Sequence, residues 1–177
     1  MNVPNSITLF RIILVPVMLY FLIEGENLSA LIVFVVAALS DGLDGFFAKI
    51  LNQKTRLGAF LDPIADKLLL STSFIVLAVF GLAPTWLAIM VVSRDLLIIT
   101  GIGILAWDND FPAIQPTIDG KITTFLQVLT IGFLLSQQYI GSYQWLYHPL
   151  ITSTGLFTAI SGTRYMLIGF RLLGDGK

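Results

Sequence analysis

The residues best suited to chemistry are four aspartates within 26 positions: Asp41, Asp44, Asp62 and Asp66. The first two are spaced i,i+3 and the last two i,i+4, so each pair lies on one face if its segment is helical. Carboxylates that converge in this way repel one another unless cations lie between them, and hard divalent ions such as Mg²⁺ prefer oxygen ligands. The spacing therefore indicates a site for one or two divalent cations.

The simpler alternative is that these acids cap helix ends or pair with nearby Lys and Arg side chains. It is disfavoured because the acids occur as two helical pairs and because Gly42 and Gly45 flank Asp44, which leaves space for a large ligand beside the carboxylates. Lys49 and Arg56 lie between the pairs and are suited to neutralise phosphates brought to the metal ions.

The elements that must position these residues are predicted to be membrane helices. The 177-residue chain is 56% hydrophobic and 12% charged, with a mean hydropathy of +0.87, which is too apolar for an ordinary soluble domain. Since a spanning helix needs about 20 mostly apolar residues, we expect one all-α domain over residues 1–177. Six transmembrane helices are predicted at 8–23, 28–51, 61–81, 84–107, 118–139 and 146–172. Pro63 suits the first turn of a helix, so the third is expected to begin near Asp62.

The positive charges predict the orientation of this domain. With the N-terminus in the cytoplasm, nine of the ten Lys and Arg residues lie on the inner side, and the tenth, Arg94, lies within the fourth span. The outer loops carry Glu24, Glu26 and His148 without Lys or Arg, an asymmetry that follows the positive-inside rule. We therefore expect both termini and all four aspartates on the cytoplasmic side of a bacterial inner membrane.

Several other classes of protein are disfavoured. The chain has no cysteine, which excludes disulfides, thiolate catalysis and Cys-ligated zinc, and a net charge of −1 gives no reason to expect nucleic acid as a partner. A small cation transporter or channel is a remote alternative, because the acids cluster at one face rather than at the midplane and no inverted repeat is visible. Residues 107–117 are interpreted as a cytoplasmic loop, and His148 as a solvated or interfacial side chain.

The acidic segment resembles the signature of the CDP-alcohol phosphatidyltransferases, Asp-x-x-Asp-Gly-x-x-Ala-Arg-x8-Gly-x3-Asp-x3-Asp. The positions that match with the same spacing are Asp41, Asp44, Gly45, Ala48, Gly58, Asp62 and Asp66. The departure is Lys49, where the family usually has Arg, so the charge is kept and the bidentate fork is lost. Six spans in a chain of this length also resemble the smallest members of the family.

The resemblance implies an enzyme that transfers a phosphatidyl group from CDP-diacylglycerol to an alcohol and releases CMP. It implies that the four aspartates bind Mg²⁺ or Mn²⁺, with two ions expected, and that Asp66 is also the base that activates the alcohol. A homodimer is expected by the same analogy. The residues expected at the CDP-lipid site are Asp41, Asp44, Gly45, Ala48, Lys49, Arg56, Gly58 and Asp62.

Three other segments are expected near the acceptor. Asn5, Thr8 and Arg11 resemble the Pro-Asn-x-x-Thr-x-x-Arg start of phosphatidylglycerophosphate synthases and cardiolipin synthases, with interfacial anchoring of the first helix as the alternative. Lys121 lies in a segment that resembles Gly-Lys-x-Thr of the phosphatidylglycerophosphate synthases, and a helix N-terminus beside a lysine suits a phosphate. Arg94, within an apolar span, needs a partner. That partner is either the acceptor phosphate or a structural ion pair, and it is expected on another helix or a ligand rather than at the adjacent Asp95.

The preferred acceptor is glycerol 3-phosphate, which would make the chain a phosphatidylglycerophosphate synthase. The alternative is phosphatidylglycerol, which would make it a cardiolipin synthase of the same family. Those phosphatidylglycerophosphate synthases commonly have a second arginine about two turns after the position of Arg94, and here that position is Ile102. A glycerol phosphate dianion would lose one contact, and this departure favours the alternative.

Overall fold

The computed structural model describes the backbone of residues 3–50, 56–107, 117–140 and 143–174, and the side chains of 7–40, 64–101, 103, 117–139 and 143–169. The described ranges form six α-helices and contain no strand, which confirms the all-helical prediction. The helices are α1 (Val3–Ile23), α2 (Asn27–Ile50), α3 (Arg56–Val79), α4 (Thr85–Trp107), α5 (Ile118–Ile140) and α6 (Gln144–Gly174).

The predicted start of the third helix is wrong. α3 begins at Arg56, so Pro63 lies beyond its first turn. A proline inside a helix removes one backbone hydrogen bond. In an apolar bundle, contacts with neighbouring helices compensate for that lost bond. α1 and α6 likewise contain Pro16 and Pro149. The loop predicted around His148 is also wrong, because α6 already begins at Gln144; the side chain of His148 is exposed, as expected.

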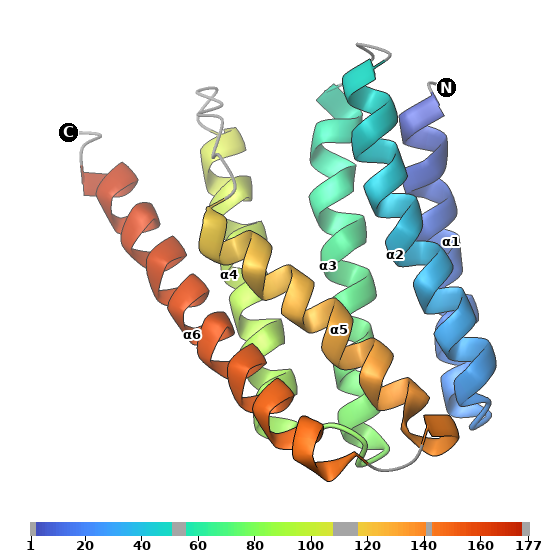
Figure 1. The fold of residues 1–177 in the computed structure, drawn as a ribbon. Coiled ribbons are helices and arrows are strands. Elements are labelled where there is room, and N and C mark those ends of the chain that lie inside the picture. The colour runs from blue at the N-terminus through green and yellow to red at the C-terminus, as the bar shows by residue number, and fades with distance from the viewer. Residues whose placement is uncertain (1–2, 51–55, 108–116, 141–142, 175–177) are drawn as a thin grey trace.

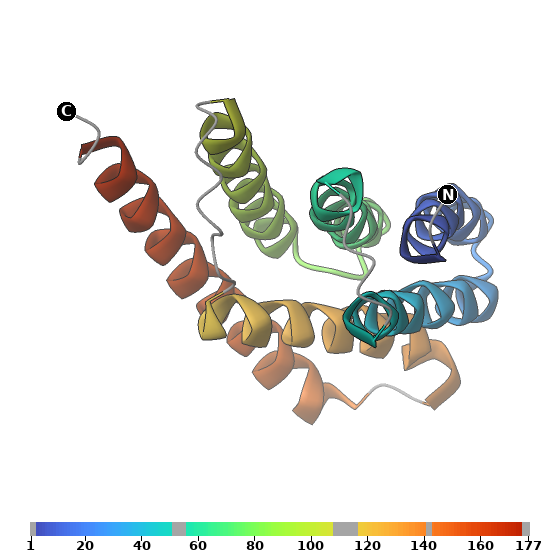
Figure 2. The same ribbon diagram turned by 90° about the horizontal axis from the view of Figure 1, so that it is seen from above.

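The helices alternate in direction along the bundle (Figure 1). The C-terminal end of α2 and the N-terminal end of α3 therefore lie at the same end of the molecule as the start of α1 and the end of α6. α1 packs on α2 and α3, and α4 packs on α3 and α6. Seen from above, α5 bridges the two groups, because it contacts both α2 and α6 (Figure 2).

The apolar core fills the end of the bundle away from the aspartates. Its fully buried members include Met18, Phe34, Phe74, Leu87 and Leu134, which come from five different helices. Toward the other end the buried residues become polar: Thr8, Arg11, Lys67, Arg94, Asp95, Thr123 and Ser161. Packing at one end therefore holds the helices together, while the opposite end is lined by groups that can interact with charged ligands.

Close packing of α4 on α6 depends on a glycine. A Cβ built at Gly155 would lie 2.7 Å from Cζ3 and 2.8 Å from Cη2 of Trp86, whereas a Cβ at Gly169 on the same helix would meet nothing within 4 Å. Such overpacking costs about 1–3 kcal/mol.

We therefore expect Gly155→Ala to lower the melting temperature of the detergent-purified protein. Gly169→Ala serves as the matched control and is expected to leave the melting temperature unchanged or slightly raised, because alanine favours the helix. Equal melting temperatures for the two variants would show that Trp86 moves aside without cost.

Within the described ranges, one helix is long and apolar enough to cross a membrane, Ile118–Tyr139. Two shorter apolar helical stretches, Ile7–Ile23 and Asn27–Ser40, fall below that length.

Candidate active site

The four aspartates lie on α2 and α3, toward the end of the bundle where α2 ends and α3 begins. Asp41 and Asp44 are in the C-terminal half of α2, and Asp62 and Asp66 are in the N-terminal half of α3. Asp66 is the one whose side chain is described. The side chains of Asp41, Asp44 and Asp62 lie outside the described residues, so their convergence on a metal ion stays a prediction.

The other residues predicted at the CDP-lipid site are carried by the same two helix segments. Gly45, Ala48 and Lys49 follow Asp44 on α2, and Arg56 and Gly58 precede Asp62 on α3. Their side chains also lie outside the described residues. The helix directions bring all of them to the end of the bundle that carries the aspartates.

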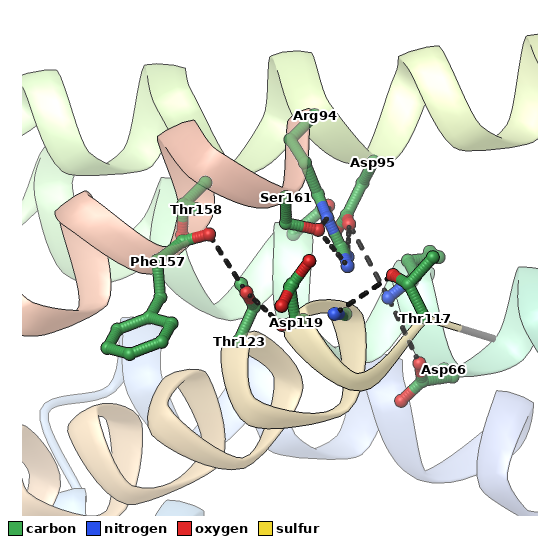
Figure 3. Close-up of polar contacts among 12 residues, drawn as sticks. Asp66, Arg94, Asp95, Thr117, Asp119, Thr123, Phe157, Thr158 and Ser161 are labelled. Carbon is green, nitrogen blue, oxygen red and sulfur yellow. Dashed lines mark hydrogen bonds and ion pairs between the residues drawn. The ribbon is translucent and has the colours of Figure 1, made fainter. Parts of the chain in front are cut away.

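Asp66 is in contact with its neighbour in sequence. Its side chain is 23% exposed, and its Oδ2 lies 3.3 Å from Nζ of Lys67, which is itself buried. The same ammonium lies 3.5 Å from Oδ1 of Asp95 on α4. Figure 3 shows the continuous line of polar contacts that runs from Asp66 to Arg94.

Arg94 is 4% exposed, and each of its three guanidinium nitrogens contacts a side chain inside the bundle. Its NH1 donates to Oδ1 of Asp95 at 2.8 Å, and its Nε and NH2 donate to Oγ of Ser161 on α6 at 3.2 and 3.1 Å. The expectation that Asp95 points elsewhere is wrong, because the long arginine side chain turns back beside its own helix neighbour. Of the two partners that the sequence left open, the ion pair is therefore present and the acceptor phosphate stays a prediction. The Cζ of Arg94 also lies 5.7 Å from the ring centroid of Tyr165.

Asp95 is the most enclosed of the four charged residues Asp66, Lys67, Arg94 and Asp95. Its side chain is 2% exposed, and its Oδ1 faces both Arg94 and Lys67. Its Oδ2 accepts a hydrogen bond from Oγ of Ser71 at 2.9 Å. A buried carboxylate is stable only when it is paired and hydrogen-bonded, and here two cations and a hydroxyl meet that condition.

The sequence did not predict the contacts made by Lys67, Asp95, Ser71 and Ser161. The signal that was available is the ionisable character of Lys67 and Asp95 within otherwise apolar helices, because such residues are rarely placed there without a role. Ser71 and Ser161 gave no such signal, because serine is common between packed helices.

The start of α5 approaches Arg94 closely. Oγ1 of Thr117 accepts from the backbone N–H of Gly120 at 3.2 Å and so caps the helix. A Cβ on Gly120 would lie 3.0 Å from the hydroxyl of Tyr165 and 3.4 Å from NH2 of Arg94. Glycine at this position therefore lets both side chains approach the helix backbone.

Two charged contacts flank this helix start. Lys121, a predicted acceptor residue, is exposed one position after Gly120. Asp119 pairs with Arg164 of α6. Lys121, Arg164 and the buried Arg94 thus place three basic residues around the N-terminus of α5, which is itself the positive end of a helix.

Two of the predicted residues of α1, Thr8 and Arg11, are buried. Thr8 and Arg11 are 1% and 0% exposed, inside a helix that packs on α2 and α3. The alternative that these side chains anchor the first helix at a lipid interface is therefore wrong. The side chain of Asn5 lies outside the described residues, and an acceptor role for Asn5 and Thr8 stays a prediction.

The chain is similar to known proteins over most of its length. The family model described as CDP-alcohol phosphatidyltransferase matches residues 1–160. A protein of Aquifex aeolicus (strain VF5) named CDP-diacylglycerol--glycerol-3-phosphate 3-phosphatidyltransferase is 37% identical over 179 residues, covering 98% of each chain. A protein of the same name from Bacillus subtilis (strain 168) is 37% identical over 150 residues, covering 76% of each chain. A putative cardiolipin synthase of Mycobacterium bovis (strain ATCC BAA-935 / AF2122/97) is 35% identical over 126 residues, covering 71% of this chain and 60% of its own.

The family model spans the aspartate signature, the buried Arg94 and the start of α5. Enzymes of this family are transferases that generally depend on a divalent metal. The chain belongs to the CDP-alcohol phosphatidyltransferase family.

Proposed function

We propose that this chain transfers a phosphatidyl group from CDP-diacylglycerol to glycerol 3-phosphate and releases CMP. The observation that carries the proposal is the relative of Aquifex aeolicus, which is named for this reaction and aligns with 98% of both chains. The aspartate signature supports the donor half of the reaction, and the basic residues around α5 support an anionic acceptor.

The donor half is assigned to the ends of α2 and α3. Asp41, Asp44, Asp62 and Asp66 would hold Mg²⁺ or Mn²⁺, with two ions proposed, because four carboxylates form an all-oxygen ligand set suited to hard cations. Bound metal would offset the charge of the diphosphate and of the departing CMP. Gly45, Ala48, Lys49, Arg56 and Gly58 would contact the CDP-lipid.

Asp66 is proposed as the base that takes the proton of the attacking hydroxyl. A base needs an oxygen within reach of that proton, and a carboxylate has two. In Asp66 the Oδ2 oxygen contacts Lys67, so the proton is assigned to Oδ1. Its partial exposure, at 23%, is consistent with access by a substrate.

The acceptor half is assigned to Arg94 and Lys121, with Asn5 and Thr8 from α1. NH2 of Arg94 already reaches the start of α5, near Gly120. A guanidinium beside a helix N-terminus is suited to a phosphate. The second candidate acceptor is phosphatidylglycerol, which Ile102 and the similarity to a putative cardiolipin synthase favour.

We further propose that all six helices cross a bacterial inner membrane, with both termini and the aspartates on the cytoplasmic side. Large apolar side chains are exposed on every helix, for example Ile13, Ile32, Ile75, Ile89, Phe125 and Leu156, and a contiguous apolar surface needs a lipid or protein cover. The end opposite the aspartates carries exposed aromatic residues typical of a membrane interface: Tyr20, Phe80, Trp86, Tyr139, Tyr143 and Trp145. A homodimer within this membrane is proposed by analogy with the family.

An acceptor screen tests the proposed substrate. Purified protein with CDP-diacylglycerol and Mg²⁺ is given glycerol 3-phosphate, phosphatidylglycerol, inositol phosphate or serine separately, and the lipid product is identified by mass. We expect phosphatidylglycerophosphate from the first acceptor. Product from phosphatidylglycerol alone would replace the proposal with cardiolipin synthesis.

A further inference from the structure

We propose that Lys67 and Asp95 are positioning residues that join the base of the reaction to the cation of the acceptor site. Neither belongs to the aspartate signature. They form the middle of a chain of alternating charges, in which Asp66, Lys67, Asp95 and Arg94 follow one another (Figure 3). This inference rests on the proposed function, because it assigns the two ends of the chain to the two halves of the reaction.

Lys67 orients the carboxylate of Asp66. Lys67 contacts Oδ2 of that carboxylate at 3.3 Å. Because Lys67 also lies 3.5 Å from the buried Asp95, its ammonium is held between two carboxylates rather than swinging freely from α3. Fixing one oxygen of a carboxylate fixes the direction of the other, so Lys67 determines where Oδ1 of Asp66 points.

Asp95 and Ser161 orient the guanidinium of Arg94. Its guanidinium is held at three nitrogens, with NH1 on Asp95 and with Nε and NH2 on Ser161. Its NH2 lies beside Gly120 at the start of α5, so an anion bound at that helix start would lie next to the guanidinium. Asp95 therefore sets the plane of the cation that is assigned to the acceptor.

Asp95 connects Lys67 to Arg94. It is buried, and it contacts both cations through the same Oδ1 oxygen, while Ser71 of α3 fixes Oδ2. Movement of Asp95 would shift Lys67 and Arg94 together. Misplacement of a reacting group by about 1 Å can lower the rate about 10²-fold. By holding both cations, Asp95 keeps the acceptor-binding Arg94 and the base Asp66 in a fixed relative position.

The test compares Lys67→Met, Asp95→Asn and the double variant in detergent, with glycerol 3-phosphate as acceptor. We expect Lys67→Met to lower kcat by about 10- to 100-fold with the KM values for both substrates little changed. Asp95→Asn is expected to lower kcat and also to raise KM for glycerol 3-phosphate, because Arg94 loses its partner. Lys67→Arg, which keeps the positive charge, is expected to recover part of kcat.

A double-mutant cycle separates positioning from a general loss of stability. If the two residues act through their contact, the double variant loses less than the product of the single losses. Losses that multiply, or wild-type kcat and KM in both single variants, would overturn the proposal. Ser71→Ala keeps every charge and is expected to shift kcat in the same direction by a smaller factor, so the proposal remains testable should a charge variant not fold.

Two controls make the outcomes distinct. Glu26→Gln removes an exposed carboxylate at the opposite end of the bundle and is expected to keep wild-type constants. A wild-type protein that releases no CMP with glycerol 3-phosphate or phosphatidylglycerol would defeat the proposed function itself. An active wild type with unaffected Lys67 and Asp95 variants would defeat this inference alone.

Discussion

Replacing Asp66 with asparagine is expected to lower turnover by at least about 10²- to 10⁴-fold, the range that a general base contributes. Asparagine keeps the shape of the side chain but has no negative charge for the proton, for a metal ion or for the ammonium of Lys67 at 3.3 Å. The measurement is the rate of CMP release from CDP-diacylglycerol at saturating acceptor. Asp62→Asn is expected to give an equally large loss, because it removes a proposed metal ligand.

The Asp66 variant needs a control for folding. Glu24→Gln removes an exposed acid at the other end of the bundle and should leave the rate unchanged. The melting temperature of Asp66→Asn should stay near that of the wild type, since the side chain is partly exposed and the apolar core lies elsewhere. A near-normal rate for Asp66→Asn would refute its assignment as the base.

Removal of divalent metal is expected to have the second large effect. Excess EDTA should abolish CMP release, and Mg²⁺ or Mn²⁺ added beyond the chelator should restore it. The reason is electrostatic, because four carboxylates and a diphosphate cannot come together without cations between them. The family generally shares this dependence on divalent metal.

Binding of the metal can be measured apart from catalysis. A ligand that binds only the folded state raises the melting temperature, so Mg²⁺ should stabilise the wild type. It should stabilise Asp41→Asn much less, because one proposed ligand is gone. Full activity in EDTA, together with no effect of Mg²⁺ on the melting temperature, would refute the proposed metal site.

The helices were predictable because each depends on local apolar length. A run of about 20 apolar residues between polar breaks favours a helix whatever surrounds it, and four of the six predicted starts fall within two residues of those found at Asn27, Thr85, Ile118 and Gln144. α1 and α3 each begin five residues before their predicted starts. Pro63 suits a first turn but lies inside α3, as Pro16 and Pro149 lie inside α1 and α6.

The polar contacts around Arg94 were not predictable in the same way. The partners of a buried arginine depend on how distant helices pack, and here Ser161 is 67 positions away in sequence. The pairing of Arg94 with Asp95 depends on side-chain rotamers, about which the spacing of residues along a helix says nothing. The family signature likewise identified Asp66 but gave no sign that Lys67 connects it to α4.

We propose that this chain moves a phosphatidyl group from CDP-diacylglycerol to glycerol 3-phosphate. The most direct test is to quantify CMP and the lipid product together in one reaction of the purified wild-type protein with Mg²⁺. We expect CMP and phosphatidylglycerophosphate in equal amounts, and neither when glycerol 3-phosphate is left out. CMP release without a phosphatidylglycerophosphate product, or no CMP release at all, would contradict the account.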